Sequence, residues 1–289
     1  MAGLYDWARF PLVPGHEIAG RVAARGPGAE WLAEGSFVGV TWVNRSCMRC
    51  VYCHRGDFVL CPQALSTGVD TPGGYQEYLL ASAATVIPLP ESLSPVLAAP
   101  LMCAGLTSYD GLVRAGDLTG RRVAVLGFGG LGRYAVHFAV KMGARVGVVS
   151  TSETKRHEAV SLGAELFVPR SDAFDQLTAW DGGPEVIVST APTSELVSEL
   201  APTLVADGHV VVLGIGAHPL KFDSHDVVDK RLTVHGSALG SVKDAERMLA
   251  FVRAVSGQPD VVSIPFDEVQ RAIALAASGK ATGRVVLTM

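Results

Sequence analysis

Four cysteines in the first quarter of the chain are spaced as metal ligands are. They are Cys47, Cys50, Cys53 and Cys61, in the pattern C-x2-C-x2-C-x7-C. Four thiolates so close together can close a tetrahedral zinc site with no position left for water, which makes a site structural rather than catalytic. A redox-active Cys-x-x-Cys pair and unrelated buried thiols are the alternatives, but a redox pair does not account for four sulfurs within reach of one another. The spacing therefore predicts one structural zinc ion in a lobe of residues 44–62.

A glycine-rich turn follows the apolar run Val123–Leu126 and opens a helical pattern. The turn contains Gly127, Gly129, Gly130, Leu131 and Gly132. In such a turn the first glycine allows a tight bend, the second lets backbone N–H groups approach a pyrophosphate, and the third lets helix and strand pack closely. The helix N-terminus then faces the phosphate charge. A glycine-rich turn without a ligand is the alternative, and the strand–helix alternation described below favours a bound dinucleotide.

The end of the next apolar strand indicates which dinucleotide is bound. An NAD protein carries Asp or Glu about 20 residues into the motif, where it binds the ribose hydroxyls. Here the strand ends in Ser150, Thr151 and Ser152, followed by Lys155 and Arg156. Hydroxyls and cations favour a 2′-phosphate, so the sequence favours NADP over NAD. A helix N-cap at Ser150 or Ser152 followed by solvated cations is the alternative, and it is compatible with phosphate binding.

These motifs lie in two contrasting parts of the chain. The first third has short β-prone runs separated by Gly, Pro and Ser, at Val22–Arg25, Phe37–Val43, Tyr75–Leu80 and Thr85–Leu89. From about Thr107 strands alternate with helical patterns. Strands are expected at Arg122–Leu126, Arg145–Val149, Leu166–Val168, Glu185–Ser189, His209–Leu213 and Leu232–Val234. Helices are expected at Tyr134–Met142, Glu153–Leu162, Val242–Ala254 and Asp267–Ala277, with a last strand at Arg284–Thr288.

This alternation predicts an α/β protein with a doubly wound parallel sheet and a mostly β domain before it. We expect a first domain over residues 1–107, a nucleotide-binding domain over 108–240, and a return to the first domain over 241–289. The length of 289 residues agrees with two domains of about 150 residues each.

Composition excludes several classes of partner. The 24 Lys+Arg and 28 Asp+Glu give a net charge of −4, and neither sign forms a block that would bind nucleic acid or an anionic membrane. No apolar run in the sequence comes near the length of ~18 residues that a membrane-spanning helix needs. Met1–Phe10 lacks the apolar core of a signal peptide. The five cysteines do not form the framework of a secreted disulfide protein. We expect a cytoplasmic protein.

Several motifs, in order, resemble the zinc-dependent medium-chain alcohol dehydrogenases. They are Pro14–Glu17 (Pro-Gly-His-Glu), the four-cysteine lobe, Ala99–Thr107, the glycine turn and Gly283–Val286. The tract Ser150–Lys155 is similar to the NADP-using, cinnamyl-alcohol-dehydrogenase-like branch. The resemblance covers almost the whole chain. It implies a GroES-like catalytic domain built from both ends of the chain, a Rossmann domain inserted in it, and an active site in the cleft.

The resemblance also implies roles for single residues. His16 and Cys103 would bind a catalytic zinc, with Glu17 beside it as an outer carboxylate or an alternate ligand. Such a zinc keeps one open position, where it polarises an alcohol oxygen and lowers the pKa of the alcohol. If the resemblance is set aside, the alternative interpretation is that His16 is a hydrogen-bonded structural histidine and Cys103 a small buried hydrophobic residue.

Further roles follow for the cofactor and the substrate. Thr107, Gly214 and Ile215 would contact the nicotinamide, and Arg284 the pyrophosphate, although a surface arginine on an edge strand is an alternative. Trp42 would line the substrate pocket, unless it is a core residue. Small-molecule alcohols or aldehydes are the expected substrates, with aliphatic and aromatic ones equally open, and a homodimer paired through Leu232–Gly236 is expected.

The sequence departs from the family pattern near its start. Family members carry a Cys-His-Ser/Thr-Asp segment that provides a first zinc ligand and a proton-relay hydroxyl, but Met1–Pro14 contain no Cys, His, Ser or Thr. We expect either a shortened gene model or a lost ligand, and for the printed chain close to one zinc ion and little alcohol oxidation. Two hypotheses stay open: an active NADP- and zinc-dependent dehydrogenase, and a catalytically impaired NADP-binding relative. A zinc-independent quinone reductase is less favoured, because such proteins generally lack the cysteine lobe and the Gly-His-Glu motif.

Overall fold

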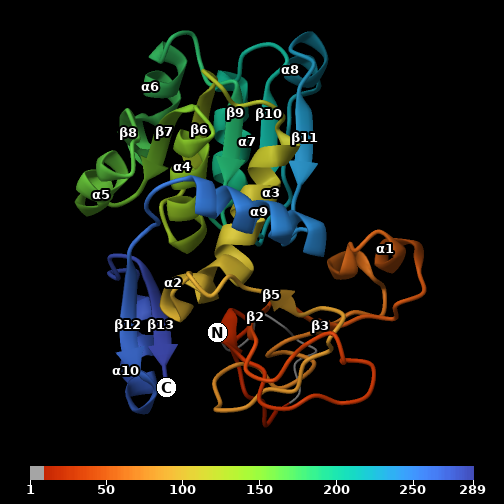
Figure 1. Ribbon diagram of the computed structural model, residues 1–289. Coiled ribbons are helices and arrows are strands. Elements are labelled where there is room, and N and C mark those ends of the chain that lie inside the picture. Colours follow the sequence, from red (N-terminus) through yellow and green to blue (C-terminus); the bar gives the residue numbers. More distant parts are fainter. Residues whose placement is uncertain (1–9) are drawn as a thin grey trace. The chain divides into compact units, whose positions relative to one another are not determined.

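The computed structural model describes residues 10–289 and divides the chain into two compact units. The first unit combines Met1–Leu106, Leu239–Ser256 and Asp260–Met289, and the second combines Thr107–Ala238 and Gly257–Pro259. The chain therefore leaves the first unit at Thr107, builds most of the second, and returns at Leu239; Gly257–Pro259 then join the second unit before the chain ends in the first (Figure 1).

Short strands build two small sheets in the N-terminal part of the first unit. One is antiparallel with the order β1-β2-β5, and the other pairs β3 with β4. The strands are β1 (Ile18–Arg21), β2 (Phe37–Val40), β3 (Val43–Arg45), β4 (Leu65–Ser66) and β5 (Ile87–Pro88). Leu32, Val38, Val40 and Val86 form the hydrophobic core beside the first sheet. The four-cysteine lobe follows β3 and contains the helices α1 (Val51–His54) and η1 (Phe58–Leu60).

Two of the strands expected here are wrong. The antiparallel partner of Phe37–Val40 is Ile18–Arg21. The expected strand Val22–Arg25 begins only where this observed strand has ended, and it leads into the turn residues Gly26-Pro27-Gly28. Tyr75–Leu80 has a strand-like pattern but pairs with no strand among residues 10–289, and its Leu80 is 91% exposed. β-prone residue types between turn residues favour a strand, but a strand also needs a neighbouring strand to pair with.

The C-terminal part of the first unit has one strand that the sequence did not reveal. β12 (Val261–Pro265) pairs in parallel with β13 (Arg284–Thr288), and α10 (Val269–Ser278) joins them. α9 (Val242–Ala254) begins at a capping box formed by Ser241 and Asp244. The expected strand at Arg284–Thr288 and the expected helix at Val242–Ala254 are confirmed residue by residue.

A helical run that no sequence pattern predicted leads from the first unit into the second. It consists of α2 (Pro95–Pro100), a π-helical turn η2 (Leu101–Gly105) and α3 (Leu106–Arg114). By length and composition, residues Pro95–Arg114 are long and apolar enough to cross a membrane, contrary to the expectation above. Because 72% of its apolar 18-residue stretch is buried within the protein, this run is weak evidence for a membrane span.

The second unit contains a six-stranded parallel sheet in the order β8-β7-β6-β9-β10-β11 (Figure 1). Its strands are β6 (Arg122–Leu126), β7 (Arg145–Ser150), β8 (Leu166–Pro169), β9 (Val186–Ser189), β10 (His209–Val212) and β11 (Thr233–Gly236). Counted along the chain, this is the 3-2-1-4-5-6 order of the Rossmann fold. The expected doubly wound sheet is confirmed.

Helices between the strands complete the second unit. They are α4 (Gly130–Lys141), α5 (Arg156–Ser161), α6 (Ala173–Ala179), α7 (Ser194–Leu200) and α8 (Ser224–Asp229). The helix expected at Glu153–Leu162 begins instead as a 3-10 turn, Glu153–Lys155. The strand order reverses between β6 and β9, so the carboxyl ends of these two strands mark where an α/β sheet binds its ligand.

Candidate functional site

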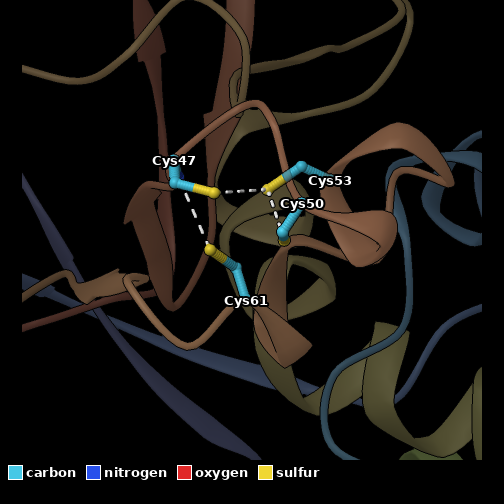
Figure 2. A group of neighbouring side chains, drawn as sticks. All are labelled: Cys47, Cys50, Cys53 and Cys61. Carbon is cyan, nitrogen blue, oxygen red and sulfur yellow. Dashed lines mark hydrogen bonds between the residues drawn. The ribbon is translucent and has the colours of Figure 1, made fainter.

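The four cysteines of the lobe point toward one another (Figure 2). Their sulfurs all lie within 4.8 Å of one another. The Sγ of Cys47 lies 3.8 Å from that of Cys53, and the Sγ of Cys50 lies 3.5 Å from the same atom. With zinc–sulfur bonds of about 2.3 Å, the sulfurs of a tetrahedral site are about 3.8 Å apart. The side chains present thus fit a four-cysteine zinc site.

Backbone N–H groups surround these sulfurs as they would surround thiolates. The N–H groups of Cys47 and Gln63 donate to the Sγ of Cys61, at 3.5 and 3.4 Å. The N–H of Arg49 lowers the pKa of Cys47. Burial raises the pKa of Cys53, but hydrogen bonds from Ser46 and neighbouring thiols outweigh burial and bring it to about 6. Donors of this kind stabilise ligating sulfur.

A second cluster of ligand atoms brings together residues from distant parts of the first unit. His16, Glu17 and Cys103 each offer one atom, and these atoms lie within 4.8 Å of one another. His16 Nε2 lies 3.2 Å from Cys103 Sγ, across 87 residues of sequence. Cys103 occupies the middle of the π-helical turn η2, a geometry that often marks functional sites.

Glycines before His16 explain how the backbone reaches this position. Gly15 has a φ of +98°, and a side chain there would lie 2.5 Å from the ring of Tyr75. The same backbone passes against Gly73, where a Cβ would lie 2.2 Å from the carbonyl oxygen of Gly15. Only glycine allows both the left-handed φ and this close approach.

The surroundings of His16 suit a metal ligand. Burial lowers the pKa of His16, so its neutral form, the form that binds metal, is favoured. Trp42 meets the imidazole edge to face, with ring centroids 5.0 Å apart and planes at 89°. Arg284 Nη2 donates to Glu17 Oε2, an ion pair that holds the carboxylate beside His16.

The donor set of this second cluster also fits zinc. A tetrahedral zinc with one nitrogen and one sulfur ligand places them about 3.6 Å apart, a few tenths of an ångström more than His16 Nε2 and Cys103 Sγ show. One histidine, one thiolate and one carboxylate make three protein ligands, which is the number in catalytic zinc sites with one open position. The carboxylate can serve as a ligand only in competition with Arg284.

The glycine turn in the second unit has the backbone that a dinucleotide needs. Gly127 has a φ of +94°, and a Cβ on Gly132 would lie 2.2 Å from the carbonyl oxygen of Gly127. A Cβ on Gly129 would meet no protein atom within 4 Å. Gly130 and Leu131 begin α4, where the first N–H groups of a helix have no partner within the helix. Tight packing at Gly132 and open space at Gly129 fit a bound pyrophosphate.

The hydroxyl tract after β7 is a compact turn. The N–H of Ser152 donates to Ser150 Oγ at 3.2 Å, and the hydroxyls of Ser152 and Thr154 are 2.8 Å apart. Ser150 is buried, and Thr151 lies between the two serines. Lys155 is the residue before α5, and its pKa is lowered by burial and by the charge of Arg133. These groups lie at the end of the strand, as their place in the sequence predicted.

Other predicted cofactor contacts are positioned by neighbouring residues that no sequence pattern indicated. Thr190, directly after β9, donates from Oγ1 to the carbonyl oxygen of Gly127 at 3.0 Å and thereby holds the glycine turn. Gly214 packs so closely that a Cβ would lie 2.5 Å from the carbonyl oxygen of Ala191. Ile215 is 89% exposed, which suits a backbone contact to a ligand more than a core position.

Thr107 is buried beside Ser108, whose hydroxyl donates to the carbonyl oxygen of Leu131 at 3.1 Å. This bond ties α3 to the first turn of α4.

Arg284, predicted at the pyrophosphate, contacts Glu17 within the first unit, and its role at the cofactor stays a prediction. No sequence pattern pointed to Thr190, Tyr75 or Arg133, since their contacts come from other elements.

Comparison with known proteins identifies the family. Residues 1–91 match the alcohol dehydrogenase GroES-like domain, and residues 130–254 match the zinc-binding dehydrogenase family. The chain is 33% identical to an alcohol dehydrogenase of Geobacillus stearothermophilus, over 98% of this chain and 85% of that one. A cinnamyl alcohol dehydrogenase of Sorghum bicolor superposes with a TM-score of 0.90 at 34% identity, over 97% of this chain and 82% of that one. The cinnamyl alcohol dehydrogenase of Helicobacter pylori complexed with NADP(H) gives a TM-score of 0.87 at 28% identity, over 97% and 82%.

The fold and the two ligand clusters thus define a medium-chain oxidoreductase with a GroES-like domain. The chain belongs to the zinc-dependent medium-chain alcohol dehydrogenases, in the cinnamyl-alcohol-dehydrogenase-like branch. The resemblance seen in the sequence is confirmed. Of the two hypotheses, the comparisons favour the oxidoreductase over the impaired relative.

Proposed function

We propose that the protein is an NADP(H)-dependent alcohol dehydrogenase that works mainly as an aldehyde reductase, with one zinc ion in the cysteine lobe and one at His16, Glu17 and Cys103. This proposal replaces the expectation of close to one zinc ion and little alcohol oxidation, because Glu17 lies close enough to His16 and Cys103 to serve as a third ligand. The observation that carries the reaction is the convergence of these three ligand atoms within 4.8 Å. Their chemistry is that of a catalytic zinc site, while four cysteines leave no position for a substrate.

Zinc bound at the second cluster would polarise the oxygen of an alcohol or aldehyde and lower the pKa of the alcohol. The protein's own residues prepare this site. His16 presents Nε2 as a neutral donor, and Trp42 packs edge on against its ring and fixes its plane. Arg284 holds the Glu17 carboxylate, so that it stays beside the ligands when it is not one of them. Trp42 is the side chain we expect to border the substrate.

The second unit supplies the cofactor site of the proposal. The open side of Gly129 and the start of α4 receive the pyrophosphate. Thr107, Gly214 and Ile215 bind the nicotinamide, and Ser150, Thr151, Ser152 and Lys155 bind the 2′-phosphate. Support for NADP(H) comes from the hydroxyls and the cation after β7, where a carboxylate would repel that phosphate.

The cofactor assignment is tested by Ser150→Asp. A carboxylate at this buried strand end is expected to repel the 2′-phosphate and to bind ribose hydroxyls, so the preference should pass from NADPH to NADH. Dissociation constants for both cofactors, measured by titration calorimetry before and after the change, decide the question. Equal affinities for the two cofactors in both proteins contradict the assignment.

Three further parts of the proposal concern the whole molecule. The residue ranges 1–107 and 241–289 form the catalytic domain, and 108–240 the cofactor domain. A homodimer pairs through β11, the edge strand of the parallel sheet, where Val234 is exposed. The protein acts in the cytoplasm on primary aliphatic or aromatic substrates. Sedimentation of the purified protein tests the dimer, and a Val234→Lys variant that stays dimeric contradicts pairing through this edge.

A further inference from the structure

Three charged side chains that interact electrostatically lie next to the hydroxyl tract of the second unit. Arg133 lies in the first turn of α4, Glu158 lies in α5, and Lys155 precedes α5 by one residue. Arg133 binds the Glu158 carboxylate with two groups, Nε to Oε1 and Nη2 to Oε2, the latter at 2.8 Å. The Arg133 side chain is only 5% exposed, and its guanidinium lies 5.4 Å from the centre of the Phe128 ring.

Both members of this ion pair interact electrostatically with Lys155. Glu158 follows Lys155 by three residues, the spacing at which helical side chains are neighbours. The charge of Arg133 opposes the ammonium of Lys155, while the carboxylate of Glu158 favours it. Among residues 10–289 no carboxylate forms an ion pair with Lys155. Glu158 is the nearby carboxylate with which Lys155 would form an ion pair, but Arg133 already donates to both of its oxygens.

We propose that Arg133 is a positioning residue for cofactor choice: by occupying Glu158, it leaves the Lys155 ammonium for the 2′-phosphate of NADP(H). This inference rests on the proposed preference for NADP(H). The three charges sum to one positive charge beside the phosphate site. Removing the arginine lets Glu158 bind Lys155, whereas removing the carboxylate leaves two cations.

The two halves of the ion pair therefore have opposite effects on selectivity. A pair that only stabilised the fold would, when broken from either side, weaken NADH and NADPH equally. Selectivity, taken as the dissociation constant of NADH divided by that of NADPH, separates the two roles. It is measured by quenching of protein fluorescence, so that no turnover is needed.

Arg133→Gln is expected to lower this ratio about twofold to fivefold, and Glu158→Gln to raise it about twofold to fivefold, the range of partly exposed charge interactions. The double variant Arg133→Gln/Glu158→Gln returns the charge sum to the original value, and its ratio should return with it. Glu165→Gln is the matched control, because Glu165 pairs with Arg145 at the opposite end of β7. Its ratio should not change.

Shifts of the same sign in both single variants, or no shift in either, overturn the inference. Arg133 is buried, and the Arg133→Gln variant can therefore fail to fold. In that case Glu158→Gln alone decides: an unchanged or lower ratio of the NADH to the NADPH dissociation constant overturns the inference. Lys155→Met separates this inference from the proposed function. If the unmodified protein prefers NADPH and Lys155→Met loses that preference, the proposed preference for NADP(H) is supported. The Arg133 and Glu158 variants then test only the role of Arg133.

Discussion

The glycine turn offers a pair of substitutions whose effects separate folding from cofactor binding. In Gly132→Ala the new Cβ would lie 2.2 Å from the carbonyl oxygen of Gly127, more than 1 Å inside the 3.4 Å at which ordinary contact begins. The obstacle is backbone, so it cannot turn away as a side chain would. Moving it also disturbs the hydrogen bond that Thr190 Oγ1 donates to the same oxygen at 3.0 Å. Overpacking and the strained hydrogen bond together are expected to lower the free energy of unfolding by about 2–4 kcal/mol.

Gly129→Ala is the matched control in the same turn. Its Cβ meets no protein atom within 4 Å, and its φ of −99° is open to any residue. The unfolding free energy should change by less than about 1 kcal/mol. The methyl group nevertheless occupies the side that receives the pyrophosphate, so the dissociation constant for NADPH should rise at least about tenfold.

Urea unfolding of the cofactor-free variants, followed by circular dichroism, measures the first effect, and calorimetric titration with NADPH measures the second. The expected pattern is a destabilised Gly132→Ala and a stable Gly129→Ala that binds cofactor poorly. A stable Gly132→Ala, or a Gly129→Ala that binds NADPH as the original protein does, refutes the account of this turn.

The remaining predictions concern zinc and pH. Cys53→Ser removes one of four converging sulfurs and should abolish zinc in the lobe and lower the melting temperature by at least about 5 °C, while Cys103→Ser should leave the lobe zinc in place; melting curves and zinc analysis of both variants check this. Retention of the full fold after exhaustive chelation, with no zinc found by mass spectrometry, contradicts the lobe assignment. His137, buried in α4, has a lowered pKa because burial disfavours its charged form and Lys141 repels it. In the unfolded chain this histidine takes up a proton below about pH 6.5, so the native state loses stability as the pH falls through that value, by at most about 1.4 kcal/mol per pH unit. His137→Gln should flatten the dependence between about pH 6.5 and 5, and an unchanged slope in urea unfolding contradicts this cause.

Local patterns predicted the parts of the site that local sequence controls. The cysteine lobe closes within one short segment, and the glycine turn is fixed by the strand before it and the helix after it, so spacing was sufficient for both. The pairing of His16 with Cys103 spans 87 residues, and only the family resemblance indicated it. The π-helical turn at Cys103 carried no local signal that we recognised.

The errors have a common physical cause. Tyr75–Leu80 is β-prone and lies between turn residues, but strand pairing depends on a neighbour elsewhere in the chain. β12 was missed for the same reason, because the strand it pairs with, β13, lies near the end of the chain. Arg133 and Glu158 are charged residues on separate helices, and sequence does not reveal that a buried arginine meets that carboxylate.

The central claim is that His16, Glu17 and Cys103 form a catalytic zinc site distinct from the lobe. The most direct measurement is zinc content per chain together with NADPH-linked aldehyde reduction, for the zinc-loaded protein and for its Cys103→Ser variant. The account predicts two zinc ions and turnover in the first protein, with one ion and at least about a hundredfold loss of turnover in the second. A zinc-loaded protein that holds a single ion, or turnover that survives Cys103→Ser, would contradict it.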